Sequence, residues 1–294
     1  MAAQSLRIGL VQSRVGPDAR ENVARTVEFV REAAGRGARL VCLQELFASP
    51  YFCQTEDPEA FAWAEALDGA SVTALSEVAR QLGITVLVPI FERRAPGLFH
   101  NSAVMVGPDG QRLGVYRKMH IPDDPQFMEK YYFTPGDLGF RAMNTPVGKV
   151  GTLICWDQWY PEAARLTALQ GAQLLLYPTA IGWLPSEKAA EGAAQLDAWK
   201  TMQRAHAIAN GLFVVAVNRV GQEGDPNTGI EFWGHSFVAD PLGRVLVEAG
   251  EGEEVLTCDL DLSMLEETRK WWPFFRDRRI DAYGDITRRW TEDS

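Results

Sequence analysis

The feature that most constrains this chain is the alternation of short, almost wholly apolar segments with longer amphipathic ones. LRIGLVQ (6–12) and RLVCLQE (39–45) have the composition of buried strands. The stretch 22–37 instead repeats apolar residues at helical spacing, with Val27 and Val30 on one face. Buried strands that alternate with amphipathic helices predict an α/β layered fold.

The same criteria predict further elements along the chain. Strands are expected at 84–92, 150–155, 172–179 and 212–220, and helices at 71–82, from Pro161 onward and over 195–210. Ser71 should cap the start of the 71–82 helix, and Gly83 should end it. Polar, glycine-rich loops are expected at 185–193 and 221–231, where they would border a pocket.

Two segments depart from this pattern and predict β-hairpins. In 101–118, two apolar strands flank a Pro-Asp-Gly sequence (108–110), and each of these residue types favours a tight turn. The segment 237–249 contains a similar turn between two apolar stretches. Hairpins add antiparallel strands, so the sheets should be mixed. No Pro-, Gly- or Ser-rich linker divides the chain, and we therefore expect one domain over 1–294.

The last part of the chain, about 263–294, carries the aromatic segment RKWWPFFRDRR (269–279). Two tryptophans and two phenylalanines on so short a segment rarely stay exposed. We therefore expect the tail to pack on the body of the protein or on a neighbouring subunit.

Composition disfavours several classes of protein. Asp and Glu number 39 against 29 Lys and Arg, a formal net charge of −10, and no basic stripe indicates a nucleic-acid partner. The four cysteines are spaced too widely for a disulfide framework or a zinc site. No signal peptide is recognisable, and runs such as 212–217 are far shorter than the ~18 apolar residues of a membrane span. We expect a cytoplasmic protein with neither membrane nor nucleic-acid partners.

Cys155 is the first candidate for a reactive side chain. It ends the apolar segment 150–155, and Pro161 begins a helix soon afterwards. A side chain at such a strand-to-helix turn lies near backbone N–H groups that stabilise an oxyanion or a thiolate. This is also the end of the sheet where open α/β folds bind ligands. The alternative is a small buried hydrophobe, the commonest role of a free cysteine.

Two charged residues end other apolar strands. Glu45 closes the strand at 39–45, and Lys118 closes the second strand of the 101–118 hairpin. Taken singly, each is better explained as a solvated strand end. No histidine has an obvious claim to act as the base for Cys155. The three strand ends become a candidate site because they can converge at one edge of a layered sheet.

Three motifs carry a resemblance to a known family. LQELFASPYF (43–52), YRKMHIP (116–122) and LICWDQWYPEAARLTALQGAQLLLYPTAIG (153–182) resemble, in this order, the three signatures of the nitrilase superfamily of carbon–nitrogen hydrolases. The resemblance covers nearly the whole chain. It implies a four-layer α-β-β-α sandwich, hydrolysis without a metal or an organic cofactor, and a homo-oligomer built from dimers.

The resemblance also implies roles for individual residues. Cys155 would be the nucleophile, Glu45 the general base and Lys118 the cation that stabilises the oxyanion, joined by the backbone N–H of Trp156. Glu129, in QFMEKYYFTPGD, matches a further glutamate that supports these three. Two ionised carboxylates and one ammonium already give the site a charge of −1. A resting thiol is therefore expected at Cys155.

More narrowly, the sequence around these motifs resembles the branch that hydrolyses N-carbamoylputrescine to putrescine, carbon dioxide and ammonia, in polyamine synthesis from agmatine. A small cationic carbamoyl-amine substrate needs carboxylates or aromatic faces beyond the carbonyl. The candidates are the acids Asp123, Asp124, Asp157 and Glu187 and the aromatic residues Tyr51, Trp156 and Trp183. Each acid is equally consistent with a solvated loop charge or a helix N-terminal carboxylate, and Asp157 with orienting the turn. Ile280 stands where many relatives carry proline, which bears only on the packing of the tail.

Several other functions are compatible with parts of this sequence. An omega-amidase, a 3-ureidopropionase or a nitrilase would use the same three residues, so only a substrate panel separates them. A catalytically silent binding protein is disfavoured because Glu45, Lys118 and Cys155 are all present. GHSFV (234–238) lacks the second glycine of a serine-hydrolase elbow, and no G-x-G-x-x-G follows the first strand. A serine hydrolase and a dinucleotide-binding enzyme are therefore disfavoured as well.

Overall fold

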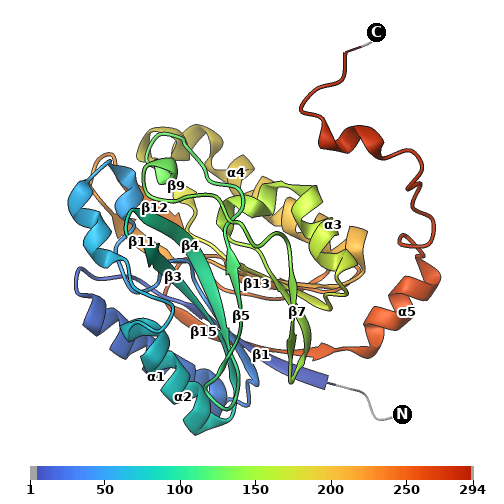
Figure 1. Cartoon of the computed structure of the whole chain (residues 1–294), viewed down its shortest axis with the longest axis horizontal. Helices are drawn as coiled ribbons and strands as arrows, with labels where there is room; N and C mark the ends of the chain where they lie inside the picture. The colour runs from blue at the N-terminus through green and yellow to red at the C-terminus, as the bar shows by residue number, and fades with distance from the viewer. Residues whose placement is uncertain (1–4, 293–294) are drawn as a thin grey trace.

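The computed structural model of the protein describes residues 5–292, whose strands form two six-stranded sheets and one three-stranded sheet (Figure 1). The first sheet has the order β15-β1-β2-β3-β4-β5, formed by Glu254–Asp261, Ser5–Gln12, Leu40–Leu43, Thr85–Ala95, Leu98–Val106 and Arg112–Arg117. The second has the order β14-β13-β10-β8-β7-β6, formed by Val245–Glu248, Phe237–Ala239, Phe213–Val217, Leu174–Pro178, Gly148–Thr152 and Ala142–Thr145. The small sheet has the order β11-β12-β9, formed by Val220–Glu223, Ile230–Trp233 and Gly182–Trp183.

Both large sheets are mixed, as the two hairpins in the sequence predict. In the first sheet β1, β2 and β3 run parallel to one another. β15 pairs antiparallel with β1, β4 pairs antiparallel with β3, and β5 pairs antiparallel with β4. In the second sheet β7, β8 and β10 run parallel to one another. β6 pairs antiparallel with β7, β13 pairs antiparallel with β10, and β14 pairs antiparallel with β13. Parallel strands are covered on both faces, which explains why their sequences are almost continuously apolar.

In the first sheet, alternate residues of the central strands face two different cores. In β2, Leu40 and Cys42 belong to the core between the two large sheets, whereas Val41 and Leu43 belong to the core outside the first sheet. This period of two is what a strand imposes on its side chains. Gly9 on β1 is needed because a Cβ there would lie 2.9 Å from the Cβ of Ala33 in a helix that packs on the sheet.

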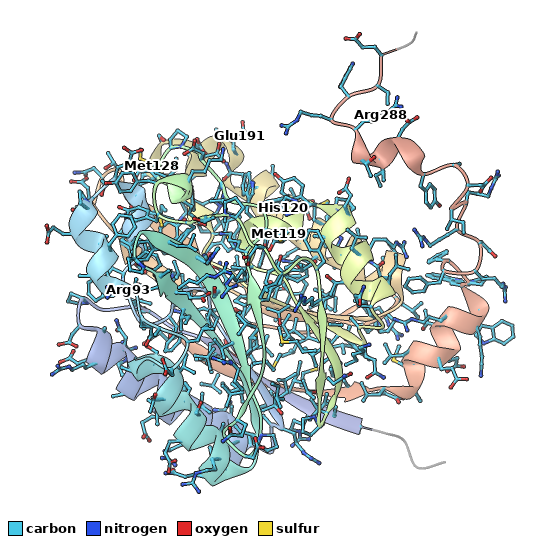
Figure 2. All side chains as sticks on the ribbon, in the orientation of Figure 1. Arg93, Met119, His120, Met128, Glu191 and Arg288 are labelled. Atoms are coloured by element: carbon cyan, nitrogen blue, oxygen red, sulfur yellow. The ribbon has the colours of Figure 1, made fainter. Side chains whose placement is uncertain are left out.

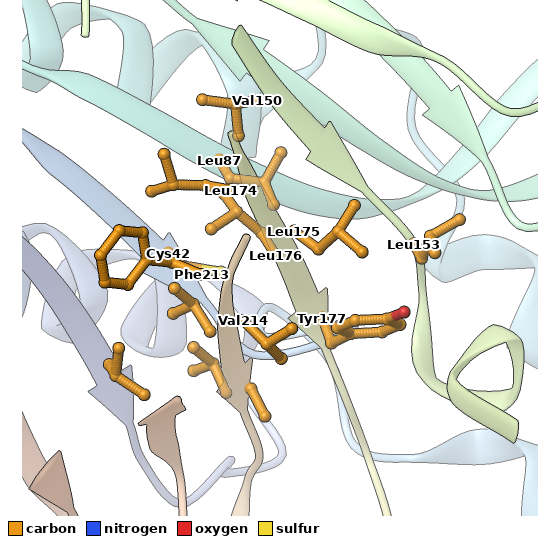
Figure 3. Packing of buried hydrophobic residues seen from close by; sticks show 14 of the residues in the cluster. Cys42, Leu87, Val150, Leu153, Leu174, Leu175, Leu176, Tyr177, Phe213 and Val214 are labelled. Carbon is orange, nitrogen blue, oxygen red and sulfur yellow. The ribbon is translucent and has the colours of Figure 1, made fainter. Parts of the chain in front are cut away.

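The core between the two large sheets is formed by branched aliphatic and aromatic side chains from both. Figure 3 shows Leu87 and Cys42 of the first sheet packed near Leu174 and Phe213 of the second. All of these side chains are almost completely buried. The two sheets therefore share one hydrophobic layer, which fixes the relative positions of the loops at their ends.

Two pairs of helices cover the outer faces. α1 (Ala19–Gly35) and α2 (Ala70–Leu82) pack on the first sheet, and α3 (Pro161–Leu169) and α4 (Pro185–Asn210) pack on the second (Figure 1). The layers are thus α-β-β-α, and the predicted fold class is confirmed. Within residues 5–292, no helix combines the length and the apolar character that crossing a membrane requires.

Two local predictions were wrong, and a third was correct only in part. The residue that caps α2 is Gly69 rather than Ser71; the backbone N–H of Ser71 instead donates to the Glu65 carboxylate at 2.9 Å. The expected loop at 185–193 is the first part of α4. Of the expected loop at 221–231, the middle part, 224–229, is a loop, and the ends belong to β11 and β12. Gly83 does end α2, in the left-handed conformation with φ 66°.

The aromatic tail packs on the body of the chain to a smaller extent than expected. α5 (Ser263–Trp271) follows β15, and the segment after it runs away from the two sheets along the side of α3 (Figure 1). Phe275 packs on Arg165 and Arg269, but Trp271 and Trp290 are 78% and 80% exposed. Packing of these tryptophans on the body is therefore not observed.

Candidate active site

The ends of three separate strands bring Glu45, Lys118 and Cys155 together. Glu45 lies two residues after β2, Lys118 directly follows β5, and Cys155 opens the 3₁₀ turn Cys155–Trp159 after β7. Cys155 therefore does not end its strand, as the sequence had suggested, but lies in the turn beyond it. The Glu45 and Lys118 side chains are fully buried, and Cys155 is 5% exposed.

The Lys118 ammonium joins two carboxylates. Its Nζ donates to Glu45 Oε1 at 2.8 Å and to Glu129 Oε2 at 2.6 Å. Asn101 Nδ2 donates to the same oxygen of Glu45 at 2.7 Å, and the Tyr51 hydroxyl donates to Glu129 Oε1 at 2.7 Å. Each carboxylate is therefore held by the ammonium and by one neutral donor.

The charges of this cluster control its protonation. Burial by itself would lower the pKa of Lys118, but the Glu129 and Glu45 carboxylates outweigh it and raise that pKa well above its ordinary value. Burial and the negative charge of Glu45 raise the pKa of Glu129 to about 7, against the opposing effect of Lys118. The ammonium is therefore charged at neutral pH, and Glu129 changes its charge close to neutrality.

Cys155 has the surroundings of a neutral thiol at rest. Burial raises its pKa well above the ordinary value, and the Glu45 carboxylate raises it further, although Lys118 acts in the opposite direction. Its Sγ makes only a weak contact, 3.8 Å from the Ala180 carbonyl oxygen. Its backbone has φ 43°, a left-handed conformation that residues with a side chain rarely adopt. Such strain is common where a turn holds a functional side chain.

One oxygen of Glu45 has no partner. Oε2 is buried without a hydrogen bond to any residue of the described chain, whereas Oε1 accepts from Lys118 and Asn101. An unpartnered oxygen of a buried carboxylate can accept a proton. Of the two carboxylates around Lys118, Glu45 is the one with this free acceptor, because both oxygens of Glu129 are engaged.

Asp157 holds the turn of Cys155 and does not line the cavity beside it. It is completely buried, and its carboxylate accepts from the backbone N–H of Ile154 at 2.9 Å and from the Tyr116 hydroxyl at 2.7 Å. It also accepts from the backbone N–H of His120 at 3.0 Å. Of the two roles weighed from the sequence, the structure places this residue in the one that orients the turn.

His120 connects the Cys155 turn with the loop that carries Lys118. Its Nδ1 lies 2.7 Å from Asp157 Oδ1, and its ring stacks on Tyr160 with the centroids 3.8 Å apart. Figure 2 shows it near the centre of the molecule, beside Met119. The sequence gives no signal for this link, because His120 and Asp157 lie 37 residues apart.

A cavity of about 540 Å³ opens beside Cys155. It is lined by Pro122, Asp124, Pro125, Phe127, Cys155, Trp156, Trp159, Ala180, Ile181, Gly182, Leu184, Glu187, Gln195, Ala198 and Trp233. The wall is mostly apolar and aromatic, and its charged side chains are two carboxylates. A cavity of this size fits a small molecule rather than a macromolecule.

The structure brings some of the predicted substrate residues to this cavity and not others. Trp156, Asp124 and Glu187 line it. Asp123 instead lies 3.8 Å from Lys130 on the surface, and Trp183 is buried, with its Nε1 donating to the Gly192 carbonyl at 2.9 Å. These two were expected to contact substrate, but neither forms part of the wall of this cavity.

Tyr51 and several unpredicted residues complete the site. Tyr51 is 2% exposed and contacts Glu129 rather than the cavity. The wall residues Phe127, Trp159 and Trp233 were not predicted, and neither was Asn101, the second donor to Glu45. Their positions depend on packing between distant segments, which no local motif reveals.

Comparison with known proteins identifies the family. The model of the family described as carbon-nitrogen hydrolase matches residues 7–270. The chain belongs to this family. The hydrolase is 42% identical over 282 residues to an N-carbamoylputrescine amidase from Solanum lycopersicum, with 94% of this chain and 93% of that protein covered. It is 38% identical over 288 residues to a citrullinase from Francisella tularensis, with 97% and 99% covered.

Solved structures agree with this assignment. A carbon-nitrogen hydrolase from Helicobacter pylori G27 superposes on the hydrolase with a TM-score of 0.95 and 47% identity, covering 98% of this chain and all of that one. A glutamate-to-glutamine mutant of an amidase from Nesterenkonia sp. AN1 superposes with a TM-score of 0.77 and 27% identity, covering 96% of each chain. That structure shows covalent addition of the acetamide moiety of fluoroacetamide at the active-site cysteine. The resemblance to the nitrilase superfamily is thus confirmed, and the chain is an amidase-type hydrolase.

Proposed function

We propose that this hydrolase cleaves the ureido group of N-carbamoylputrescine to give putrescine, carbon dioxide and ammonia. The observation that carries the proposal is the composition of the cavity beside Cys155. Its wall within the described chain contains the carboxylates Asp124 and Glu187 but no Lys, Arg or His. A cavity with this wall favours a substrate that carries a cation beyond the carbon that Cys155 attacks.

In the proposed reaction the unpartnered oxygen of Glu45 takes the thiol proton as Cys155 Sγ attacks the ureido carbon. The oxygen that becomes negative is stabilised by the Lys118 ammonium and by the backbone N–H of Trp156. Loss of one such donor typically costs ~10²–10³ in kcat. Collapse of the tetrahedral intermediate breaks a C–N bond, and Glu45 returns the proton to the departing nitrogen.

A covalent thioester-like intermediate on Cys155 remains. Glu45 then removes a proton from water, which attacks the same carbonyl carbon. The sulfur leaves as a thiolate and takes this proton from Glu45, which restores the resting thiol and carboxylate. The product is a carbamic acid, which breaks down to carbon dioxide and an amine or ammonia. Glu45 serves as base in both halves, and Lys118 stabilises both tetrahedral intermediates.

The cationic end of the substrate would lie between the two acids and the aromatic residues of the cavity. Gln195 Nε2 donates to Glu187 Oε2 at 3.0 Å, which orients that carboxylate. Trp156 and Trp159 offer faces for a cation–π contact. The citrullinase relative prompts comparison with citrulline, which has a carboxylate besides its ammonium group. A wall without a basic side chain gives that carboxylate no cationic partner.

A substrate panel tests the proposal. N-carbamoylputrescine, citrulline and 3-ureidopropionate are compared by ammonia release, and we expect kcat/KM for the first to be about tenfold higher or more, one tenfold step being about 1.4 kcal/mol. Comparable values on all three substrates would eliminate the cationic-pocket argument. Detection of ammonia from an aliphatic amide but not from any ureido compound would favour an omega-amidase instead.

Variants of the wall give the residue-level test. Because Asp124 and Glu187 remain exposed to solvent, each pair with an ammonium is worth ~0.2–1 kcal/mol. Asp124→Asn and Glu187→Gln should therefore each raise KM for N-carbamoylputrescine by up to about fivefold and change kcat little. Asp123→Asn is the matched control, since this neighbouring acid does not line the cavity, and it should leave KM unchanged.

The setting of this reaction belongs to the same proposal. A product such as putrescine places the hydrolase in polyamine formation from agmatine, in the cytoplasm. The exposed tryptophans of the tail support a homo-oligomer built from dimers, because apolar side chains of that size are usually covered by a partner. Leu166 and Leu169 of α3 are also largely exposed and lie beside the tail.

A further inference from the structure

A buried arginine lies directly behind the catalytic cluster and has no part in the chemistry described above. Arg219, between β10 and β11, is completely buried, and its guanidinium is 5.2 Å from the ring centroid of Phe232 and 5.9 Å from that of Tyr51. Burying such a cation is unfavourable unless it is paired and hydrogen-bonded. The groups that compensate it show what it holds in place.

Arg219 donates to backbone carbonyls of the segment that carries Glu45. Its Nη2 lies 2.9 Å from the carbonyl oxygen of Glu45 and 2.8 Å from that of Leu46, and both terminal nitrogens lie near the carbonyl of Ser49, at 3.4 and 3.5 Å. Leu46 has φ 49°, a left-handed conformation that a leucine adopts at some cost. The guanidinium therefore fixes a strained turn directly next to the general base.

The anion that pairs with Arg219 continues the same network to Tyr51. Arg219 Nη1 donates to Glu223 Oε1 at 2.7 Å, and Glu223 Oε2 accepts from the backbone N–H of Tyr51 at 2.7 Å. Tyr51 in turn donates its hydroxyl to Glu129. The Arg219–Glu223 ion pair thus holds both ends of the segment 45–51. The first residue of this segment is Glu45, and the last, Tyr51, contacts the Glu129 carboxylate.

We propose that Arg219 and Glu223 are positioning residues for the reaction. They hold the segment 45–51 so that the two carboxylates stay on either side of the Lys118 ammonium and Glu45 keeps its free oxygen available for the proton of Cys155. Neither residue touches the cavity that would hold the substrate. They act on proton transfer and not on substrate binding. This inference rests on the proposed catalytic roles but not on the identity of the substrate.

Arg219→Lys is the first test. A lysine keeps the charge but replaces the planar fork of donors with a single ammonium, which cannot reach the carbonyls and Glu223 together. Because a misplacement of about 1 Å can cost 10²-fold, we expect kcat to fall about 10- to 100-fold. KM should stay within about twofold, and so should the Kd for substrate measured in a Cys155→Ser background.

The matched control is Arg269→Lys. Arg269 also donates to three backbone carbonyls, those of Gly211, Ala172 and Asn210, at 3.1 to 3.3 Å, but at the other end of the second sheet. It should leave kcat unchanged. Equal losses in the two variants, or a parallel loss of substrate binding and kcat in Arg219→Lys, would show a general structural role and overturn the proposal.

A second readout does not need the natural substrate. The negative charge of Glu45 raises the pKa of Cys155, so a less firmly held Glu45 should move the pH profile of Cys155 alkylation by iodoacetamide downward, by about half a unit or more. The Arg269→Lys profile should match that of the wild type. An unshifted profile in a folded Arg219→Lys variant contradicts the proposal, whereas failure of the wild type on N-carbamoylputrescine contradicts only the substrate assignment.

Glu223→Gln keeps the inference testable if Arg219→Lys does not fold. Glu223 accepts at both oxygens, but a glutamine has one acceptor oxygen, so its amide N–H₂ must face either Arg219 or the Tyr51 N–H. We expect the same pattern as for Arg219→Lys: kcat reduced, KM retained and the alkylation profile shifted downward. A folded Glu223→Gln variant with wild-type kcat would refute the positioning role.

Discussion

Glu129→Gln removes one negative charge from the buried cluster with little change of shape. In the wild type, Glu129 accepts from Lys118 Nζ at 2.6 Å and from the Tyr51 hydroxyl at 2.7 Å. The glutamine oxygen can keep the bond to Lys118, and the Tyr51 hydroxyl can rotate to accept from the amide nitrogen. The variant should therefore fold, and changes in its activity report on charge.

The size of the expected fall in activity at acid pH follows from the pKa of Glu129, which burial and the charge of Glu45 raise to about 7. Below this value the wild-type carboxylate is protonated, and the Lys118 ammonium loses one of its two anionic partners. With a single protonation, activity falls about tenfold for each pH unit well below the pKa, and half of the carboxylate is already protonated at pH 7, so kcat/KM should fall ~50-fold between pH 7 and pH 5. Activity is thus present above pH 7 and lost as the pH falls through it.

Glu129→Gln cannot undergo this protonation. At pH 8 it should be slower than the wild type by about 10- to 100-fold, because the ammonium is then balanced by Glu45 alone. The ratio of wild-type to variant activity should shrink by up to ~100-fold on going to pH 5, because only the wild type loses activity through Glu129. Any remaining acid limb in the variant should lie well below pH 7.

The assay is ammonia release from N-carbamoylputrescine over pH 5–9 in buffers of constant ionic strength. Glu65→Gln serves as the control, because burial raises the pKa of Glu65 too but this residue lies near the start of α2, where it accepts from Ser71. Its profile should match the wild type. An acid limb at the same pH in wild type and Glu129→Gln would refute the reasoning and assign the titration to another group.

Three further predictions follow from the same geometry. Because burial and Glu45 raise the pKa of Cys155, its rate of alkylation by iodoacetamide should keep falling as the pH drops, with no thiolate plateau below pH 6; such a plateau would indicate a stored ion pair. Because the pKa of Glu129 is raised, its contribution to the free energy of unfolding is fully present below its ordinary pKa of 4.5 and is lost as the pH rises through about 7. Between pH 5 and pH 8, the Tm of Glu129→Gln should therefore rise relative to that of the wild type, as measured by thermal unfolding. A chain ending at Arg279 lacks the exposed Ile286 and Trp290, and light scattering should show a smaller assembly than for the full chain; equal masses would exclude this part of the tail from the interface.

The sequence predicted the layers well because burial on both faces leaves a strong local signal. β1, β2, β3, β8 and β10 are short, nearly continuous apolar runs, and each lies where such a run was found. The start of α4 was missed because Gly192 interrupts the helical pattern. The structure shows why glycine is there: a Cβ would lie 3.0 Å from Trp183 Nε1, which donates to the carbonyl of the same residue. A tertiary contact thus overrode local propensity.

The residues of the candidate site also differ in how far the sequence predicts them. Glu45, Lys118 and Cys155 were found because each lies in a recognisable motif at a strand end, and the fold brings strand ends together. Trp183, also predicted to contact substrate, is instead buried and is not part of the cavity wall. No sequence feature shows whether an aromatic residue in a motif-rich segment lines a cavity or packs in the core. The outcome depends on which residues of other segments lie against it.

No motif could reveal the set of bonds that hold the proposed catalytic residues in position. Arg219 lies 174 residues from the Glu45 carbonyl to which it donates, and Asp157 lies 41 residues from the Tyr116 hydroxyl that it accepts from. In sequence, one is a charge after an apolar strand and the other an acid near a helix start, and both are usually solvated. Their burial changes the argument, because a buried charge persists only where several partners compensate it. Apart from Glu223, the partners of both are the main chain or fixed side chains of the segments that carry Glu45, Lys118 and Cys155. The groups that compensate burial therefore also fix the proposed proton path.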